Sequence, residues 1–114
     1  EALLSPVPQE MVLNIPAGGM IYDLDNDDIV EINCMVSCNG IKPSLVGPLP
    51  EPVKGLICTV KQYERLTVSA AVLKSRQLAV QALLNHPLIH GWHNAISIVR
   101  AMEHAFPQYI SLRE

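Results

Sequence analysis

The segment GPLPEP, residues 47–52, divides the chain into two parts of different character, because it places three prolines and a glycine within six residues. Seven of the nine prolines lie in residues 1–52. Proline removes a backbone donor and clashes with the preceding helical turn, so this first part is expected to be extended. Beyond Pro52, apolar residues recur every three or four positions, which is the helical period. The sequence therefore predicts an α+β fold, with short strands within about residues 11–46 and helices within about residues 53–105.

Three runs in the first part are expected to form strands. The run MVLNI, residues 11–15, stops at Pro16 and is followed by a turn at residues 17–19, AGG. In residues 29–36, IVEINCMV, apolar and polar side chains alternate, which predicts a strand with one buried face carrying Val30, Ile32 and Cys34. A turn at Asn39-Gly40 and a third extended piece at residues 41–46 complete this part.

The second part is expected to contain three helices. The first runs from about residue 53 to 71, and its core-facing stripe comprises Val53, Leu56, Ile57, Val60, Tyr63, Thr67, Ala70 and Ala71. Ser75 is expected to cap a second helix over about residues 77–84, which Asn85-His86-Pro87 closes. The third is expected from about Trp92 to Ala105, ending before Pro107, with Ile96, Val99 and Met102 buried.

Composition narrows the class of protein. A chain of 114 residues with 49% apolar residues favours one domain with its own core. The net charge of -3 does not favour a nucleic-acid partner, and the longest apolar runs are too short to span a bilayer.

The sequence begins at Glu1 without an initiating Met or a targeting segment, so we expect a piece of a longer chain. An odd number of cysteines in apolar surroundings (Cys34, Cys38 and Cys58) predicts free, mostly buried thiols and a reducing compartment.

Three groups of residues could be interpreted as metal sites, and a simpler structural interpretation exists for each group. The acidic run at residues 23–28 fails as a calcium loop because Asp28 and Cys34 stand where glycine and glutamate are required, so a solvated turn is expected. Cys34 and Cys38 lack the second ligand pair of a zinc site. His86, His90 and His93 are interrupted by Pro87 and Gly91, so core packing or a hydrogen-bonded turn is the expected role, with metal binding as the alternative.

The sequence also lacks two common motifs, the glycine-rich phosphate-binding loop and the nucleophile elbow of serine hydrolases. Gly18-Gly19 lacks the spacing of a phosphate-binding loop, and no Gly-x-Ser-x-Gly elbow occurs. Taken from the residues alone, the chain is an α+β domain without a self-contained active site.

Several ordered blocks resemble the C-terminal region of glycoside hydrolase family 4, most closely its 6-phospho-β-glucosidases. They are VLNIPAGGMI (12–21), VEINC (30–34), NG (39–40), VGPLP (46–50), KQYERLTVSAA (61–71) and QALLNHPLI (81–89). The resemblance runs from about residue 11 to 89, and the tail with His90-Gly91-Trp92-His93 lies outside it.

The resemblance implies a cytoplasmic, homo-oligomeric enzyme that uses NAD and manganese to cleave 6-phosphoglucosides by oxidation, elimination and re-reduction. It also implies an α+β fold like the C-terminal domain of lactate dehydrogenases. In the family, the NAD-binding Rossmann domain, the metal ligands and the tyrosine base lie upstream of the matched region, so no catalytic, cofactor-binding or metal-binding residue is expected in residues 1–114. Cys34, Cys58, His86 and Tyr63 are therefore given no such role, and no NAD or Mn²⁺ is expected on this piece alone.

Two hypotheses follow from the resemblance. In the first, the chain is the C-terminal domain of such an enzyme, inactive alone, contributing substrate-pocket walls and oligomer contacts, with Tyr63 and Glu64 on a helix packed in the domain or at a subunit contact. An α-glucoside or α-galactoside substrate class within the same family is an alternative to the β-glucoside. In the second hypothesis, the chain is a stand-alone binding or assembly module with the same fold.

Overall fold

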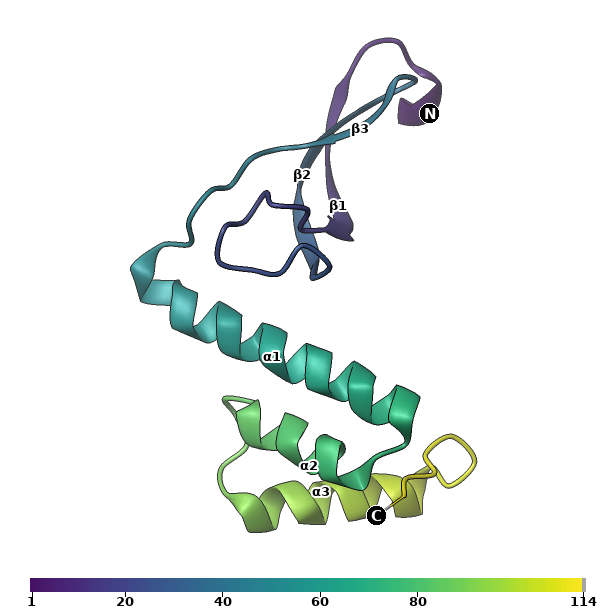
Figure 1. Ribbon diagram of the computed structural model, residues 1–114. Coiled ribbons are helices and arrows are strands. Elements are labelled where there is room, and N and C mark those ends of the chain that lie inside the picture. Colours follow the sequence, from purple (N-terminus) through teal and green to yellow (C-terminus); the bar gives the residue numbers. More distant parts are fainter. Residues whose placement is uncertain (114) are drawn as a thin grey trace. The chain divides into compact units, whose positions relative to one another are not determined.

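The computed structural model describes residues 1–113, and the chain divides into two compact units (Figure 1). The first unit, Glu1–Lys54, holds a short 3₁₀ helix η1 (Ala2–Leu4) and the strands β1 (Gln9–Pro16), β2 (Ile29–Ser37) and β3 (Gly40–Pro43). The helix α1 (Glu51–Leu73) begins in the first unit and continues into the second. The second unit begins at Gly55 and also holds α2 (Arg76–Asn85) and α3 (Trp92–Ala105). The α+β class is thus confirmed, and the single domain stays a prediction.

The three strands form one antiparallel sheet in the order β1-β2-β3. The register of β1 on β2 runs from Gln9 opposite Val36 to Pro16 opposite Ile29. Along β2, Val30, Ile32 and Cys34 are buried and the residues between them are exposed, so the predicted one-sided strand is confirmed. Together with Ala17, Ile21, Leu24, Val36 and Leu49, these side chains form the apolar interior of the first unit.

The turn at residues 17–19 is also confirmed. Gly18 and Gly19 have φ values of 51° and 83°, a region that glycine enters without steric cost. The third strand, in contrast, is shorter than the expected residues 41–46 and ends at Pro43. After it, the N–H groups of Val46 and Gly47 both donate to the carbonyl of Met20, at 2.9 and 3.0 Å. The chain therefore leaves β2 here, because its backbone groups bond instead to the segment that follows the glycine turn.

The three helices form where the sequence predicts them. Ser75 is the N-cap of α2, and its Oγ accepts a hydrogen bond from the N–H of Leu78 at 3.3 Å, as expected for a capping serine. Helix α2 ends at Asn85, one residue beyond the expected Leu84 and within the expected Asn85-His86-Pro87 stop, and α3 spans the predicted residues. Pairing of α2 with α3 buries Val80, Ala95 and Val99, against which Ile89, Ile96 and Leu112 pack.

Two burial predictions in this second part are wrong. Of the stripe expected on α1, only Ala70 is fully buried, while Val53, Leu56, Thr67 and Ala71 are exposed. Met102 of α3 is exposed as well. The helical period identifies which side chains share a face, but burial also requires a second element to cover that face. Within residues 1–113, no helix is long and apolar enough to cross a membrane.

Candidate functional site

The acidic turn before β2 is held together by two of its own carboxylates. Asp23 accepts a hydrogen bond from the N–H of Leu49 through Oδ2 at 2.7 Å, and its Oδ1 lies 2.5 Å from Nζ of Lys54. The Lys54 ammonium, and then the Leu49 N–H, lower the pKa of Asp23 below its usual value, because both stabilise the charged form. Its side chain is only 16% exposed. Asp23 therefore joins the turn to the segment that leads into α1.

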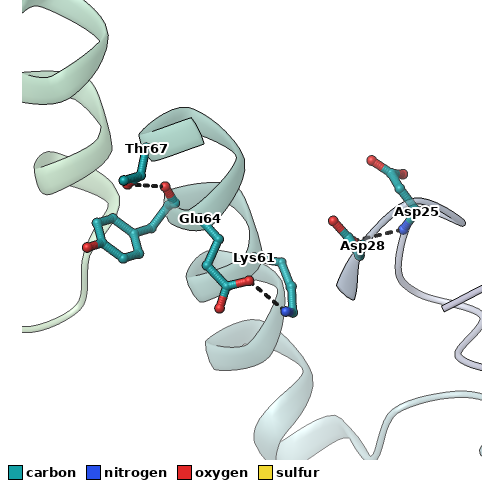
Figure 2. A network of polar contacts seen from close by, with 6 residues as sticks. Asp25, Asp28, Lys61, Glu64 and Thr67 are labelled. Carbon is teal, nitrogen blue, oxygen red and sulfur yellow. Dashed lines mark hydrogen bonds and ion pairs between the residues drawn. The ribbon is translucent and has the colours of Figure 1, made fainter. Parts of the chain in front are cut away.

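Asp28 plays a similar part inside the turn. It is buried, and its Oδ2 accepts a hydrogen bond from the N–H of Asp25 at 3.1 Å (Figure 2). The expected solvated turn is thus correct for Asp25, Asn26 and Asp27, which are exposed, and wrong for Asp23 and Asp28. The two engaged carboxylates bind backbone N–H groups of their own unit, which is a structural role.

The three histidines have different environments. His86 is the C-cap of α2, and its Nδ1 accepts a hydrogen bond from the N–H of Leu88 at 3.2 Å. Its ring meets the ring of Tyr63 edge to face, with centroids 4.7 Å apart. His90 and His93 are exposed, and the carbonyl of His90 accepts a hydrogen bond from the Asn94 side chain. His86 is therefore a packing and turn histidine, as predicted, while the side chains of His90 and His93 face solvent.

The three cysteines are all thiols, as predicted, but they are not mostly buried. Cys34 is completely inaccessible, Cys58 is half-buried, and Cys38 is exposed. Cys38 lies in the two-residue loop between β2 and β3, where Ser37 pairs with Gly40. A hairpin loop of two residues places its side chains in solvent, which overrides the apolar sequence around the cysteine.

Tyr63 and Glu64 are neighbours on α1 with separate roles. Tyr63 is half-buried against His86, which confirms that it packs within the unit. Glu64 is exposed, and its Oε2 accepts a hydrogen bond from Nζ of Lys61 at 2.6 Å, a pair one turn apart on the helix (Figure 2). The Oγ1 of Thr67 donates to the carbonyl of Tyr63 at 2.8 Å (Figure 2).

Among residues 1–113, no three His, Cys, Asp or Glu side chains come together in a group that could hold a metal ion.

The second unit contains a cavity of about 390 Å³ between α1, α2, α3 and residues 108–112. Alanines form much of its wall: Ala70, Ala71, Ala79 and Ala82. The cavity can therefore bind a molecule, but the described residues that line it do not include a nucleophile in contact with a base.

Sequence reasoning did not predict this cavity. Several of its lining residues are alanines at the end of one expected helix and the start of the next, but alanines at these positions also suit close helix packing and so do not predict a cavity. Lys74, which also lines the cavity, gave no signal, because its placement depends on the turn between α1 and α2.

The profile described as "Family 4 glycosyl hydrolase C-terminal domain" matches residues 1–89. A probable 6-phospho-beta-glucosidase of Bacillus subtilis is 35% identical over 98 residues, which are 86% of this chain and 22% of that protein. The 6-phospho-beta-glucosidase BglT of Thermotoga maritima is 32% identical over 101 residues, which are 89% of this chain and 24% of that protein.

Solved structures extend the similarity to the tail. A 6-phospho-beta glucosidase from Thermotoga maritima with manganese, NAD+ and glucose-6-phosphate matches with a TM-score of 0.87 and 30% identity, over 97% of this chain and 27% of that one. A 6-phospho-alpha-glucosidase from gut microorganisms with NAD and glucose-6-phosphate matches with a TM-score of 0.90 and 28% identity, over 98% of this chain and 26% of that one. The similarity in fold therefore continues past residue 89, where the resemblance in sequence was expected to stop.

The chain spans about a quarter of the length of the relatives it matches. The profile match over residues 1–89, the sequence identity and the agreement in fold lead to one conclusion: this chain belongs to glycosyl hydrolase family 4 and corresponds to the family's C-terminal domain.

Proposed function

We propose that this chain is the C-terminal part of a 6-phosphoglucosidase that depends on NAD and Mn²⁺, and that it is inactive alone. The observation that carries the proposal is the agreement in fold, over 97% of the chain, with a 6-phospho-beta glucosidase structure that contains manganese, NAD+ and glucose-6-phosphate. The relatives' other three quarters have no counterpart in this sequence.

The residues described here do not fit either cofactor. No group of three ligating side chains occurs among residues 1–113, and the sequence has no glycine-rich dinucleotide fingerprint. We therefore assign no step of the reaction to a residue of this chain. Its proposed part is structural, supplying walls of the substrate pocket and contacts between subunits of a homo-oligomer.

Exposed apolar side chains on α1 support this structural part. Leu56, Val68, Val72 and Leu73 are each more than half exposed, and they follow one another along a single helix. Val68 and Val72, four residues apart, share one face of the helix, and neighbouring exposed apolar side chains are a feature of interaction surfaces. In the proposed enzyme, α1 contacts another part of the protein.

A β-glucoside is the proposed substrate class. The two 6-phospho-beta-glucosidase relatives align over 98 and 101 residues, whereas the phospho-alpha-glucosidase and maltose-6'-phosphate glucosidase relatives align over 73 to 76 residues. The longer alignments favour the β-class, and an α-glucoside is the competing outcome. The three thiols are consistent with a reducing cytoplasm, which is the proposed location.

The test uses the full-length product of the gene that encodes this chain. Hydrolysis of p-nitrophenyl β-glucoside 6-phosphate and its α-anomer is measured with NAD, MnCl₂ and a thiol reductant, and with each omitted in turn. The proposal predicts turnover that requires both NAD and Mn²⁺, faster with the β-anomer. Turnover without NAD, or none with either anomer, would overturn it, and a preference for the α-anomer would correct the substrate class.

A further inference from the structure

One wall of the cavity in the second unit is formed by residues 108–112, because the chain after α3 returns to the turn between α1 and α2. The N–H of Arg113 donates to the carbonyl of Lys74 at 2.6 Å, and the N–H of Arg76 donates to the carbonyl of Arg113 at 2.9 Å. Leu112 packs against the core formed by Val80, Ala95 and Val99. The wall contributed by residues 108–112 is therefore fixed at its end by two backbone hydrogen bonds and an apolar contact.

The hollow itself results from small side chains. Alanines of α1 and α2 line the space, and because an alanine extends no further than its Cβ, they take up little of it. A volume of about 390 Å³ lies within the range of pockets that bind small molecules. Two aromatic rings, Tyr63 and Tyr109, lie on its wall and offer flat apolar surfaces.

Among the described residues, the charge that lines this cavity is positive. Lys74 contributes the cationic side chain to the lining, and no Asp or Glu of residues 1–113 lines the cavity. Lys74 adopts a φ of 53°, a backbone conformation unusual for a residue with a side chain, and it is exposed at the mouth of the cavity. An apolar hollow with one ammonium group is complementary to a molecule with an apolar ring system and one anionic group.

We propose that this cavity binds a small aromatic anion, with its rings between the alanines of α1 and α2 and its carboxylate, sulfonate or phosphate group at Lys74. This site is separate from the proposed glucosidase activity and does not depend on it. It requires only the second unit's own helices and residues 108–112.

The test titrates the 114-residue chain with 1-anilinonaphthalene-8-sulfonate, whose two ring systems are apolar and whose sulfonate is anionic. Lys74→Asn removes the charge and keeps a residue that tolerates a positive φ. Ala71→Leu places bulk at the exposed edge of the cavity, without overpacking a buried position. The matched controls are Lys42→Asn on β3 and Ala101→Leu on α3, both exposed and outside the cavity lining.

The expected result is saturable binding of one dye per chain, weakened roughly three- to tenfold in Lys74→Asn because one ion pair with the sulfonate is lost. Ala71→Leu weakens it further, and the two control variants bind as the unsubstituted chain does. Binding that does not saturate, or that is the same in all five proteins, would overturn the proposal. Circular dichroism verifies that each variant is folded.

A second measurement needs no variant. Two-dimensional ¹H–¹⁵N spectra of the unsubstituted chain, recorded with increasing dye, should show the largest shifts at the amides of Thr67, Ala71, Ala79 and Tyr109. Shifts centred on β1 or β2 would place the dye elsewhere and contradict the proposal.

Discussion

The carboxylate of Asp23 lies 2.5 Å from the ammonium group of Lys54, so an ion pair links the turn that follows β1 to the first turn of α1 within the first unit. The same carboxylate accepts the N–H of Leu49. Two segments more than twenty residues apart are thus held by one side chain, which makes Asp23 the most informative position for testing the fold of this unit.

Replacing Asp23 is expected to lower the free energy of unfolding in two steps. Asp23→Asn removes the charge that attracts Lys54 but keeps an oxygen for the Leu49 N–H, whereas Asp23→Ala removes both interactions. Urea unfolding at neutral pH should therefore rank Asp23→Ala below Asp23→Asn, and both below the unsubstituted chain. Asp27→Asn, on the exposed side of the same turn, is the matched control and should have little effect.

The contribution of Asp23 should also depend on pH. Its pKa is lowered in the folded state, first by Lys54 and then by the Leu49 N–H, so its stabilisation is fully present above the ordinary aspartate pKa of about 3.9. The stabilisation is lost as the pH falls through the lower folded value. The difference in stability between Asp23→Asn and the unsubstituted chain should therefore narrow in acid, and a difference that stays constant from neutral pH into acid would contradict this assignment.

The cap of α2 gives a second prediction. Ser75→Ala removes the oxygen that accepts the Leu78 N–H, which should destabilise the chain by about 1 kcal/mol. Ser97→Ala, at an exposed position inside α3, serves as the comparison and should cost less. Equal effects of the two substitutions in urea unfolding would show that Ser75 does not act as a cap.

Burial in the second unit gives a third prediction. Val99 is 4% exposed in the core between α2 and α3, so Val99→Ala should cost about 1–3 kcal/mol. Val72 on α1 is 75% exposed, and Val72→Ala should change the stability of the 114-residue chain by less than about 0.5 kcal/mol. A large loss at Val72 would mean that α1 is covered in solution and would contradict its role as an exposed contact surface.

The thiols give a fourth prediction. Ellman's reagent should modify Cys38 first, Cys58 more slowly, and Cys34 only when the sheet opens, because their exposure falls in that order. Cys38→Ser should remove the fast phase and leave the other two unchanged. Rapid modification of Cys34 in the folded chain would contradict the burial of that side chain.

Much of the fold could be predicted from local pattern. The alternation along β2 and the serine at position 75 are signals carried by neighbouring residues, and the structure confirms both. The ends of the helices follow from prolines and caps for the same reason. These features could be predicted because residues close in the sequence determine them.

The wrong predictions concern features that depend on distant parts of the chain. The stripe on α1 was expected to be buried because of its period, yet Leu56 is 56% exposed, since the period does not supply a covering element. The third strand ends early because Val46 and Gly47 bond to Met20, a partner more than twenty residues away. Asp23 was expected in a solvated turn for the same reason, because neither Leu49 nor Lys54 is visible from the local sequence. Asp28 is the exception, since its partner, the N–H of Asp25, lies only three residues away. The cavity beside Lys74 likewise depends on residues 108–112 returning to the start of α2.

In the proposed function, this chain is a structural part of a larger 6-phosphoglucosidase. The most direct measurement is the hydrolysis of p-nitrophenyl β-glucoside 6-phosphate, with NAD, Mn²⁺ and a reductant, by the 114-residue chain and by the full-length product of its gene side by side. We expect turnover by the full-length protein and none by the chain alone. Turnover by the 114-residue chain would contradict it.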